Sequence, residues 1–160
     1  MPSKLNNLQI AQENLKLDKV TVENCFYRKG TAEGGEVNLR YKEIDIGWDK
    51  LDNQIIFRLD VGCMVASGDF KSDVIEDDEF FAVVEATYST SYILIDSEIS
   101  DECIEEFADR NVILHVWPFF RELVYSSLQK MNVEPQSIQI IAPHKVVKKV
   151  NGQRQVNEDT

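Results

Sequence analysis

The chain has 160 residues, and 17 lysines and arginines against 28 aspartates and glutamates give it a formal net charge of −11. This length is typical of one domain, and 43% apolar with 28% charged residues is ordinary for a globular protein. The acidic balance argues against nucleic acid as a partner, because its binding depends on lysine and arginine neutralising phosphates. The sequence contains no apolar run long enough for membrane insertion and no secretory signal at its start. Three widely spaced cysteines then predict reduced thiols and a cytoplasmic location.

Alternation of apolar and polar residues predicts strands in the first two thirds of the chain. The first two predicted strands change phase, near Asp18 and after Tyr41, as at a β-bulge or a crossing between surfaces. Their connections are too short for helical crossovers, so we expect an antiparallel sheet. The four predicted strands are Leu15–Phe26, Val37–Trp48, Ile55–Val65 and Phe80–Leu94.

The periodicity becomes helical after Ile95. Ser100 is a good N-cap, and acidic residues in the first turn complement the helix dipole, which predicts a short helix over residues 101–109. A longer helix is predicted over residues 112–131, with a kink or restart at Pro118, which removes a backbone hydrogen bond.

The apolar side chains of the longer helix cover about half of its circumference, more than the ~100° that seats a helix on one sheet. Either another part of the chain or a second subunit must cover the excess, and we favour the subunit because little chain remains. The stripe assigned to this oligomer interface contains Val112, Val116, Phe119 and Leu123. Residues 1–143 are expected to form one domain, followed by a basic, disordered tail over residues 144–160.

No motif for catalysis is present: the sequence lacks G-x-S-x-G, a P-loop, H-E-x-x-H and C-x-x-C. Cys103 and His115 are a weak candidate for a nucleophile and its base. Cys103 is expected on the apolar side of its helix and His115 on the polar side of the next, so the two side chains should not meet. The acidic residues 76–79 lack the glycine spacing of a calcium loop and predict a solvated loop. We therefore expect no enzyme, no metal site and no cofactor. Surplus aromatic residues instead suggest an apolar groove for unfolded chains, with Trp48 and Phe80 as candidate client-binding residues.

The longer predicted helix contains the sequence Trp-Pro-Phe-Phe-Arg-Glu-Leu over residues 117–123, followed by Pro135-Gln136 and Ala142-Pro143. These features resemble the SecB family of export chaperones, which has a Pro-aromatic-x-Arg-Glu segment in its long helix and Pro-Gln and Ala-Pro steps at matching distances. Together with the order of the strands, the resemblance covers residues 15–143.

The resemblance implies an α+β fold, in which a four-stranded antiparallel sheet carries a short and a long helix on one face. It implies a homotetramer, built as a dimer of dimers, that acts as a cytoplasmic holdase without ATP. Such a holdase binds unfolded preproteins for export and delivers them to the SecA motor. The family docks this motor through acids on the first strand and a Leu-x-Glu on the fourth. Glu23, Val83 and Glu85 occupy these positions here, while Lys19 stands where an acid is expected.

Three functions remain open at the level of sequence. The first is a general SecB-like holdase, and the second is an oligomeric SecB-fold adaptor dedicated to one partner, such as an antitoxin. They differ in whether several unrelated unfolded proteins are kept soluble or only one. The third is a small enzyme or ligand-binding domain, which needs a convergent polar pocket that the sequence does not supply.

Overall fold

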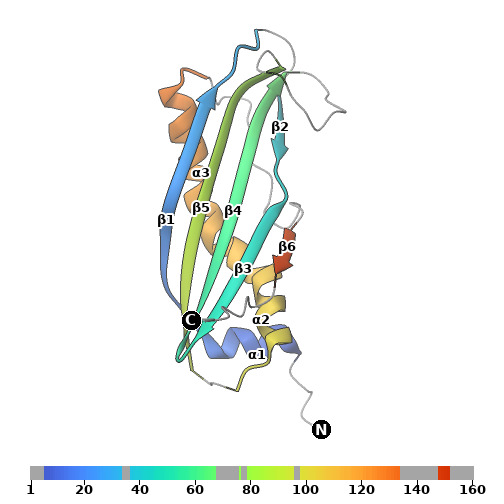
Figure 1. Ribbon diagram of the computed structural model, residues 1–160, viewed down its shortest axis with the longest axis vertical. Helices are drawn as coiled ribbons and strands as arrows, with labels where there is room; N and C mark the ends of the chain where they lie inside the picture. Colours follow the sequence, from blue (N-terminus) through green and yellow to red (C-terminus); the bar gives the residue numbers. More distant parts are fainter. Residues whose placement is uncertain are drawn as a thin grey trace, which may run out of the picture.

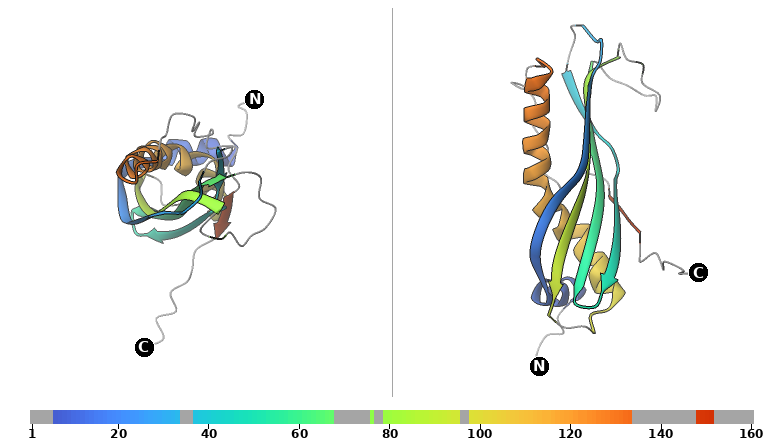
Figure 2. Two further views of the ribbon diagram at one scale, coloured as in Figure 1. Left: turned by 90° about the horizontal axis from the view of Figure 1, so that it is seen from above. Right: turned by 60° about the vertical axis from the view of Figure 1, so that its left-hand side comes forward.

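The computed structural model describes residues 6–33, 37–67, 76, 79–95, 98–133 and 148–151. A long, twisted sheet forms one layer, and the C-terminal helices run along one of its faces (Figures 1 and 2). The strands are β1 Leu15–Lys29, β2 Val37–Tyr41, β3 Ile44–Leu51, β4 Gln54–Ser67, β5 Phe80–Leu94 and β6 Lys148–Asn151. The helices are α1 Asn7–Asn14, α2 Asp101–Phe107 and α3 Ile113–Lys130.

The sheet has six strands in the order β1-β5-β4-β3-β6, with β2 also paired to β4. The expected four-stranded sheet is therefore correct only for its antiparallel centre. Both β2 and β3 pair with β4, so the second predicted strand is present but divided at Lys42 and Glu43. The remaining strand, β6, comes from the predicted tail and pairs with β3 in parallel.

The long edge strand β1 contains two irregularities in its pairing with β5, between Leu17 and Lys19 and between Val22 and Asn24. The first confirms the predicted change of phase near Asp18, whereas the second was not predicted. At each irregularity β1 has one residue more than β5. The extra residue shifts the alternation, so every later side chain of β1 points to the face opposite the one that regular alternation would give it.

Helix α1 precedes the first predicted strand and was missed. Asn6 caps it: the Asn6 side chain accepts a hydrogen bond from the Gln9 backbone N–H at 2.9 Å, and the Gln9 side chain accepts one from the Asn6 backbone N–H at 3.1 Å. This reciprocal capping box begins a helix that buries only Ala11, so its apolar periodicity is weak. The Asn-x-x-Gln spacing was the available signal.

The two predicted C-terminal helices form one continuous helical segment. Ser100 caps α2 as expected, accepting a hydrogen bond from the Cys103 N–H at 3.3 Å. A single π-helical turn, Ala108–Val112, joins α2 to α3 in place of the expected break. Pro118 lies inside α3, and the kink predicted there stays a prediction.

The core lies between the sheet and this helical segment, and it corrects the predicted interface stripe. Val112 and Val116 are completely buried within the single chain, Leu123 is partly buried, and only Phe119 is half-exposed. Both valines belong to the hydrophobic core between the sheet and the helical segment, and β6 lies beside the π-helical turn that contains Val112. Val112 and Val116 are therefore core residues and not surface available to a second subunit.

The tail is thus ordered over at least the four residues of β6, which corrects the expectation of disorder for Lys148–Asn151. Its packing has a simple cause, because Val150 contacts the hydrophobic core. The Pro135-Gln136 and Ala142-Pro143 steps, and most of the acidic loop after Ser67, lie outside the described residues.

Candidate functional site

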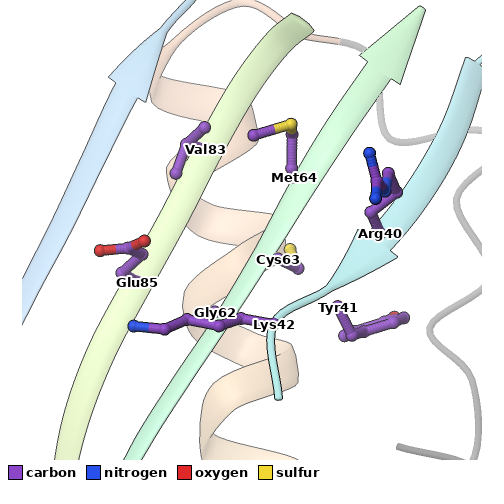
Figure 3. Close-up of a pocket in the computed structure, with 8 residues that line it drawn as sticks. All are labelled: Arg40, Tyr41, Lys42, Gly62, Cys63, Met64, Val83 and Glu85. Carbon is purple, nitrogen blue, oxygen red and sulfur yellow. The ribbon is translucent and has the colours of Figure 1, made fainter. Parts of the chain in front are cut away.

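The sheet face opposite the helices is hollowed where β2, β4 and β5 run side by side. The hollow has a volume of about 340 Å³ and is centred on Gly62 (Figure 3). A Cβ atom at Gly62 would lie 3.2 Å from Glu85 Cγ and 3.5 Å from Lys42 Cβ, so glycine leaves room for both side chains. The Lys42 side chain crosses β4 over Gly62 toward Glu85, and with Arg40 the lining contains two bases and one acid. Its lining residues are Arg40, Tyr41, Lys42, Gly62, Cys63, Met64, Val83 and Glu85.

The predicted motor-docking residues fall into two places on this outer face. Val83 and Glu85 line the hollow around Gly62, two residues apart on β5. Glu23 lies at the second irregularity of β1, where its Oε2 is 3.2 Å from Arg58 Nε. Both side chains of this ion pair are well exposed, so the pair contributes little to stability. The three residues share a face but not a hollow, and their role in docking a motor stays a prediction.

A second and larger hollow, of about 580 Å³, lies on the outer face at the β3 edge. Among the described residues, its lining contains four carboxylates and two basic side chains, Arg58 and Lys149. One carboxylate, Asp60, accepts a hydrogen bond from Thr87 Oγ1 at 2.7 Å. The net negative charge favours a basic segment over an acidic one. The full lining is Glu23, Asp45, Gly47, Trp48, Asp49, Ile56, Arg58, Asp60, Ser89, Lys149 and Asn151.

This acidic hollow was missed, although the sequence held a signal for it. Asp45 and Asp49 alternate on β3, and Asp60 pairs with Asp45 on β4, so all three carboxylates project to one face. Alternating acids on the polar side of two predicted strands therefore mark a charged surface. The alternation does not predict that Lys149 lines this hollow, because Lys149 belongs to β6, far from β3 in the sequence.

The predicted client-binding residues are not on the surface. Trp48 is 3% exposed and Phe80 is 1% exposed. Trp48 lies opposite Phe57 in the pairing of β3 with β4, on the face that the helices cover, and this explains its burial. The Arg28 guanidinium lies 5.0 Å from the centre of the Phe80 ring. Neither side chain is available to a client, which corrects that assignment.

Accessible apolar side chains instead gather on β1 and on α3. Phe119 and Leu114 of α3 are 52% and 51% exposed, and Phe26 of β1 is 50% exposed. Among the residues that the structure describes, the large apolar side chains that are exposed are Leu17, Val22, Phe26, Tyr27, Val37, Leu51, Ile93, Ile95, Leu114 and Phe119.

Some polar groups inside the core make structural contacts, whereas others within the described ranges are buried without a hydrogen-bond partner, namely Trp48 Nε1, Tyr88 OH and Thr90 Oγ1. The Tyr92 hydroxyl lies 2.7 Å from His115 Nδ1, and burial lowers the pKa of His115. Cys103 lies 3.1 Å from Ser100 Oγ. Burial raises the pKa of Cys63 to about 12, so this thiol stays protonated and poorly nucleophilic at neutral pH. None of the helices in the described part of the chain has the length and apolarity needed to cross a membrane.

Comparison with known proteins gives a structural match and no sequence match. No protein-family model matches the chain, and no curated protein is significantly similar in sequence. The structure is similar to the SecB-like chaperone Rv1957 of Mycobacterium tuberculosis, with a TM-score of 0.67 and 10% identity, over 82% of this chain and 93% of that chain. This chain has a SecB-like fold. The resemblance seen in the sequence is confirmed at the level of the fold, and that neighbour was solved in complex with a ChAD peptide from the HigA1 antitoxin.

Proposed function

We propose that this protein is a SecB-like chaperone that binds an extended segment of a partner polypeptide without ATP, and that it serves one partner or a few. The observation that carries the proposal is the SecB-like fold, shared over most of both chains with a chaperone that holds an antitoxin peptide. The proposal assigns the chain no enzymatic step.

Two features of the chain favour a dedicated adaptor over a general holdase. The aromatic residues Trp48 and Phe80, which a broad apolar groove would use, are buried. The larger of the two hollows described on the outer face is lined by four carboxylates, so it favours partners by their charge as well as by their apolar surface.

A general export holdase is the second candidate. Val83 and Glu85 line an open hollow on the sheet face, where a motor such as SecA would reach them, and Glu23 is exposed nearby on the same face. In that case the clients are unfolded preproteins and the protein works in the cytoplasm.

A homotetramer is part of the proposal for either candidate. The half-exposed side chains of Leu114 and Phe119 on α3 are the apolar surface that a second copy would cover. Full burial of one such side chain contributes about 1.5–3 kcal/mol, so their exposure in a free monomer favours self-association.

Aggregation measurements separate the two candidates. Two unrelated denatured proteins, one acidic and one basic, are diluted with and without a stoichiometric amount of the protein, and their light scattering is followed. A dedicated adaptor leaves both to aggregate but binds selected members of a peptide set tiled along one partner. A general holdase suppresses both. Aggregation of every client, together with no binding to any peptide, refutes the proposed function.

A further inference from the structure

The outer edge of β3 is occupied by the chain's own C-terminal strand. β6 pairs in parallel with Ile44–Gly47, so that Lys149 lies opposite Asp45 and Val150 opposite Ile46. Figure 1 shows β6 as a short strand beside β3, far in sequence from every other strand of the sheet. An edge strand presents unpaired backbone groups that any extended chain can satisfy, and here a segment of the tail satisfies them.

The side chains of β6 meet two different surfaces. Lys149 projects into the acidic hollow, which also contains Asp45, Asp49 and Asp60. On the other side, Val150 contacts the hydrophobic core, while Lys148 lines a hollow beside the start of α3. The β3 edge therefore accepts a basic side chain on one face of the added strand and an apolar one on the other.

Charge explains the basic position. Among the described residues Asp45 and Asp49 form no ion pair, whereas Glu23 is paired with Arg58. Lys149 is the cation that the tail brings to this group of carboxylates. As far as the structure describes the chain, Lys149 forms no ion pair with Asp45 or Asp49, so it acts through the longer-range attraction between its charge and the carboxylates, which a segment without a basic residue at this position lacks.

The pairing of β6 is short. Four residues in a parallel ladder form few hydrogen bonds, and parallel pairs are slightly less stable per residue than antiparallel pairs. Val150 and Lys148 are only partly buried, and Lys149 and Asn151 are exposed. A strand held so weakly belongs to the part of a fold that opens locally at low free-energy cost.

We infer that the Ile44–Gly47 edge of β3 is a strand-addition site for an extended partner segment with a basic residue followed by a β-branched apolar residue, and that β6 occupies this site as an internal competitor. The inference rests on the proposed function and names its binding site. Backbone pairing to β3 supplies affinity, and the acidic hollow supplies selectivity for the basic residue. A partner must displace β6, so binding is weakened by the fraction of time that the tail occupies the edge.

The test uses the full chain and a fluorescent peptide that copies residues 144–153, with binding followed by anisotropy. The variant Lys149→Glu weakens the internal strand, and Lys16→Glu, an exposed residue of β1 at the opposite edge, is the matched control for charge. If the tail occupies the edge about nine-tenths of the time, release of the tail lowers the peptide Kd about tenfold. We expect that decrease for Lys149→Glu and no decrease for Lys16→Glu.

The site itself is tested from the other side. A lysine-to-glutamate change at the peptide position that matches Lys149 should weaken peptide binding at least tenfold. Asp45→Lys weakens the internal strand and the peptide together, because both place a lysine opposite Asp45, so its apparent Kd should stay within a few-fold of the wild type. Hydrogen exchange should show faster exchange of the Ile44–Gly47 amides in Lys149→Glu, and renewed protection when the peptide is added.

Equal peptide affinity for the wild type and for Lys149→Glu overturns the inference, as does equal affinity of the wild type for the peptide and for its lysine-to-glutamate form, or protection that appears on another strand. If these results occur while the protein still binds peptides of a partner, the proposed function stands and only the site is wrong. If the protein binds no peptide and suppresses no aggregation, both fail.

Discussion

The exposed part of α3 gives the sharpest prediction about assembly, and Phe119→Ser is its perturbation. Phe119 is 52% exposed, whereas Val116, one turn earlier, is completely buried. Phe119→Ser should therefore weaken self-association while the folded protomer keeps its stability. Val116→Ala should do the reverse, because it removes core packing inside each protomer.

The expected size follows from the exposed fraction. Burying a whole phenylalanine side chain contributes about 1.5–3 kcal/mol, so burying the exposed half contributes about 0.75–1.5 kcal/mol. A two-fold interface contains the side chain twice, which doubles the loss to about 1.5–3 kcal/mol. Since about 1.4 kcal/mol is a tenfold change, the dimer dissociation constant should rise about 10- to 150-fold.

Sedimentation velocity over a range of protein concentrations measures this shift, and thermal unfolding of the same samples measures protomer stability. A wild-type protein that remains monomeric at micromolar concentration would refute the reasoning. So would a Phe119→Ser variant whose dissociation constant is unchanged, since a second copy would then cover some other surface.

Three further predictions concern the core and the acidic hollow. Phe120 is completely buried between α3 and the sheet, so Phe120→Ala should lower the free energy of unfolding by about 3–5 kcal/mol in denaturant titrations, and a loss below 1 kcal/mol would contradict the described packing. Burial lowers the pKa of His115 below its ordinary value of 6.5, so the unfolded state binds more protons as pH falls through 6.5 and stability should fall there; His115→Gln should remove this part of the pH dependence, and identical slopes for both proteins would exclude it. Capture of a basic peptide should slow with added salt, because the carboxylates around Asp45 act over a Debye length of about 8 Å at physiological ionic strength; stopped-flow rates that do not change with salt would exclude steering by this hollow.

Local patterns predicted the centre of the fold well. Alternation located β4 and β5, and the change of phase after Tyr41 corresponds to the break between β2 and β3. The N-cap at Ser100 marked the start of α2. These features depend on neighbours within a few residues, so the sequence carries them directly.

The errors arose where distant segments meet. Trp48 sits at an alternating position, but its face became the buried one only through the pairing of β3 with β4 and the helices above them. Val112 and Val116 were assigned to a second subunit because little chain remained to cover them. They lie instead in the core between the sheet and the helices, and the strand β6 beside the π-helical turn was missed because no local pattern announces a parallel strand of that length.

The two edges of the sheet consequently carry different parts of the proposed function. In the described residues β1 pairs on one side only, along 15 residues, and several of the exposed apolar side chains lie on it. At the other edge β3 is covered by a weakly held strand of the same chain and flanked by carboxylates. This long open edge lies beside α3, and together with the exposed Phe119 of α3 it suits permanent association with another copy, because an uncovered apolar edge favours aggregation. A short edge covered by a displaceable strand suits reversible binding, because the competitor protects the backbone groups until a segment of matching charge replaces it. Assembly and partner binding are therefore expected to respond to separate substitutions: Phe119→Ser should change oligomer size without changing peptide selectivity, and Lys149→Glu should do the opposite.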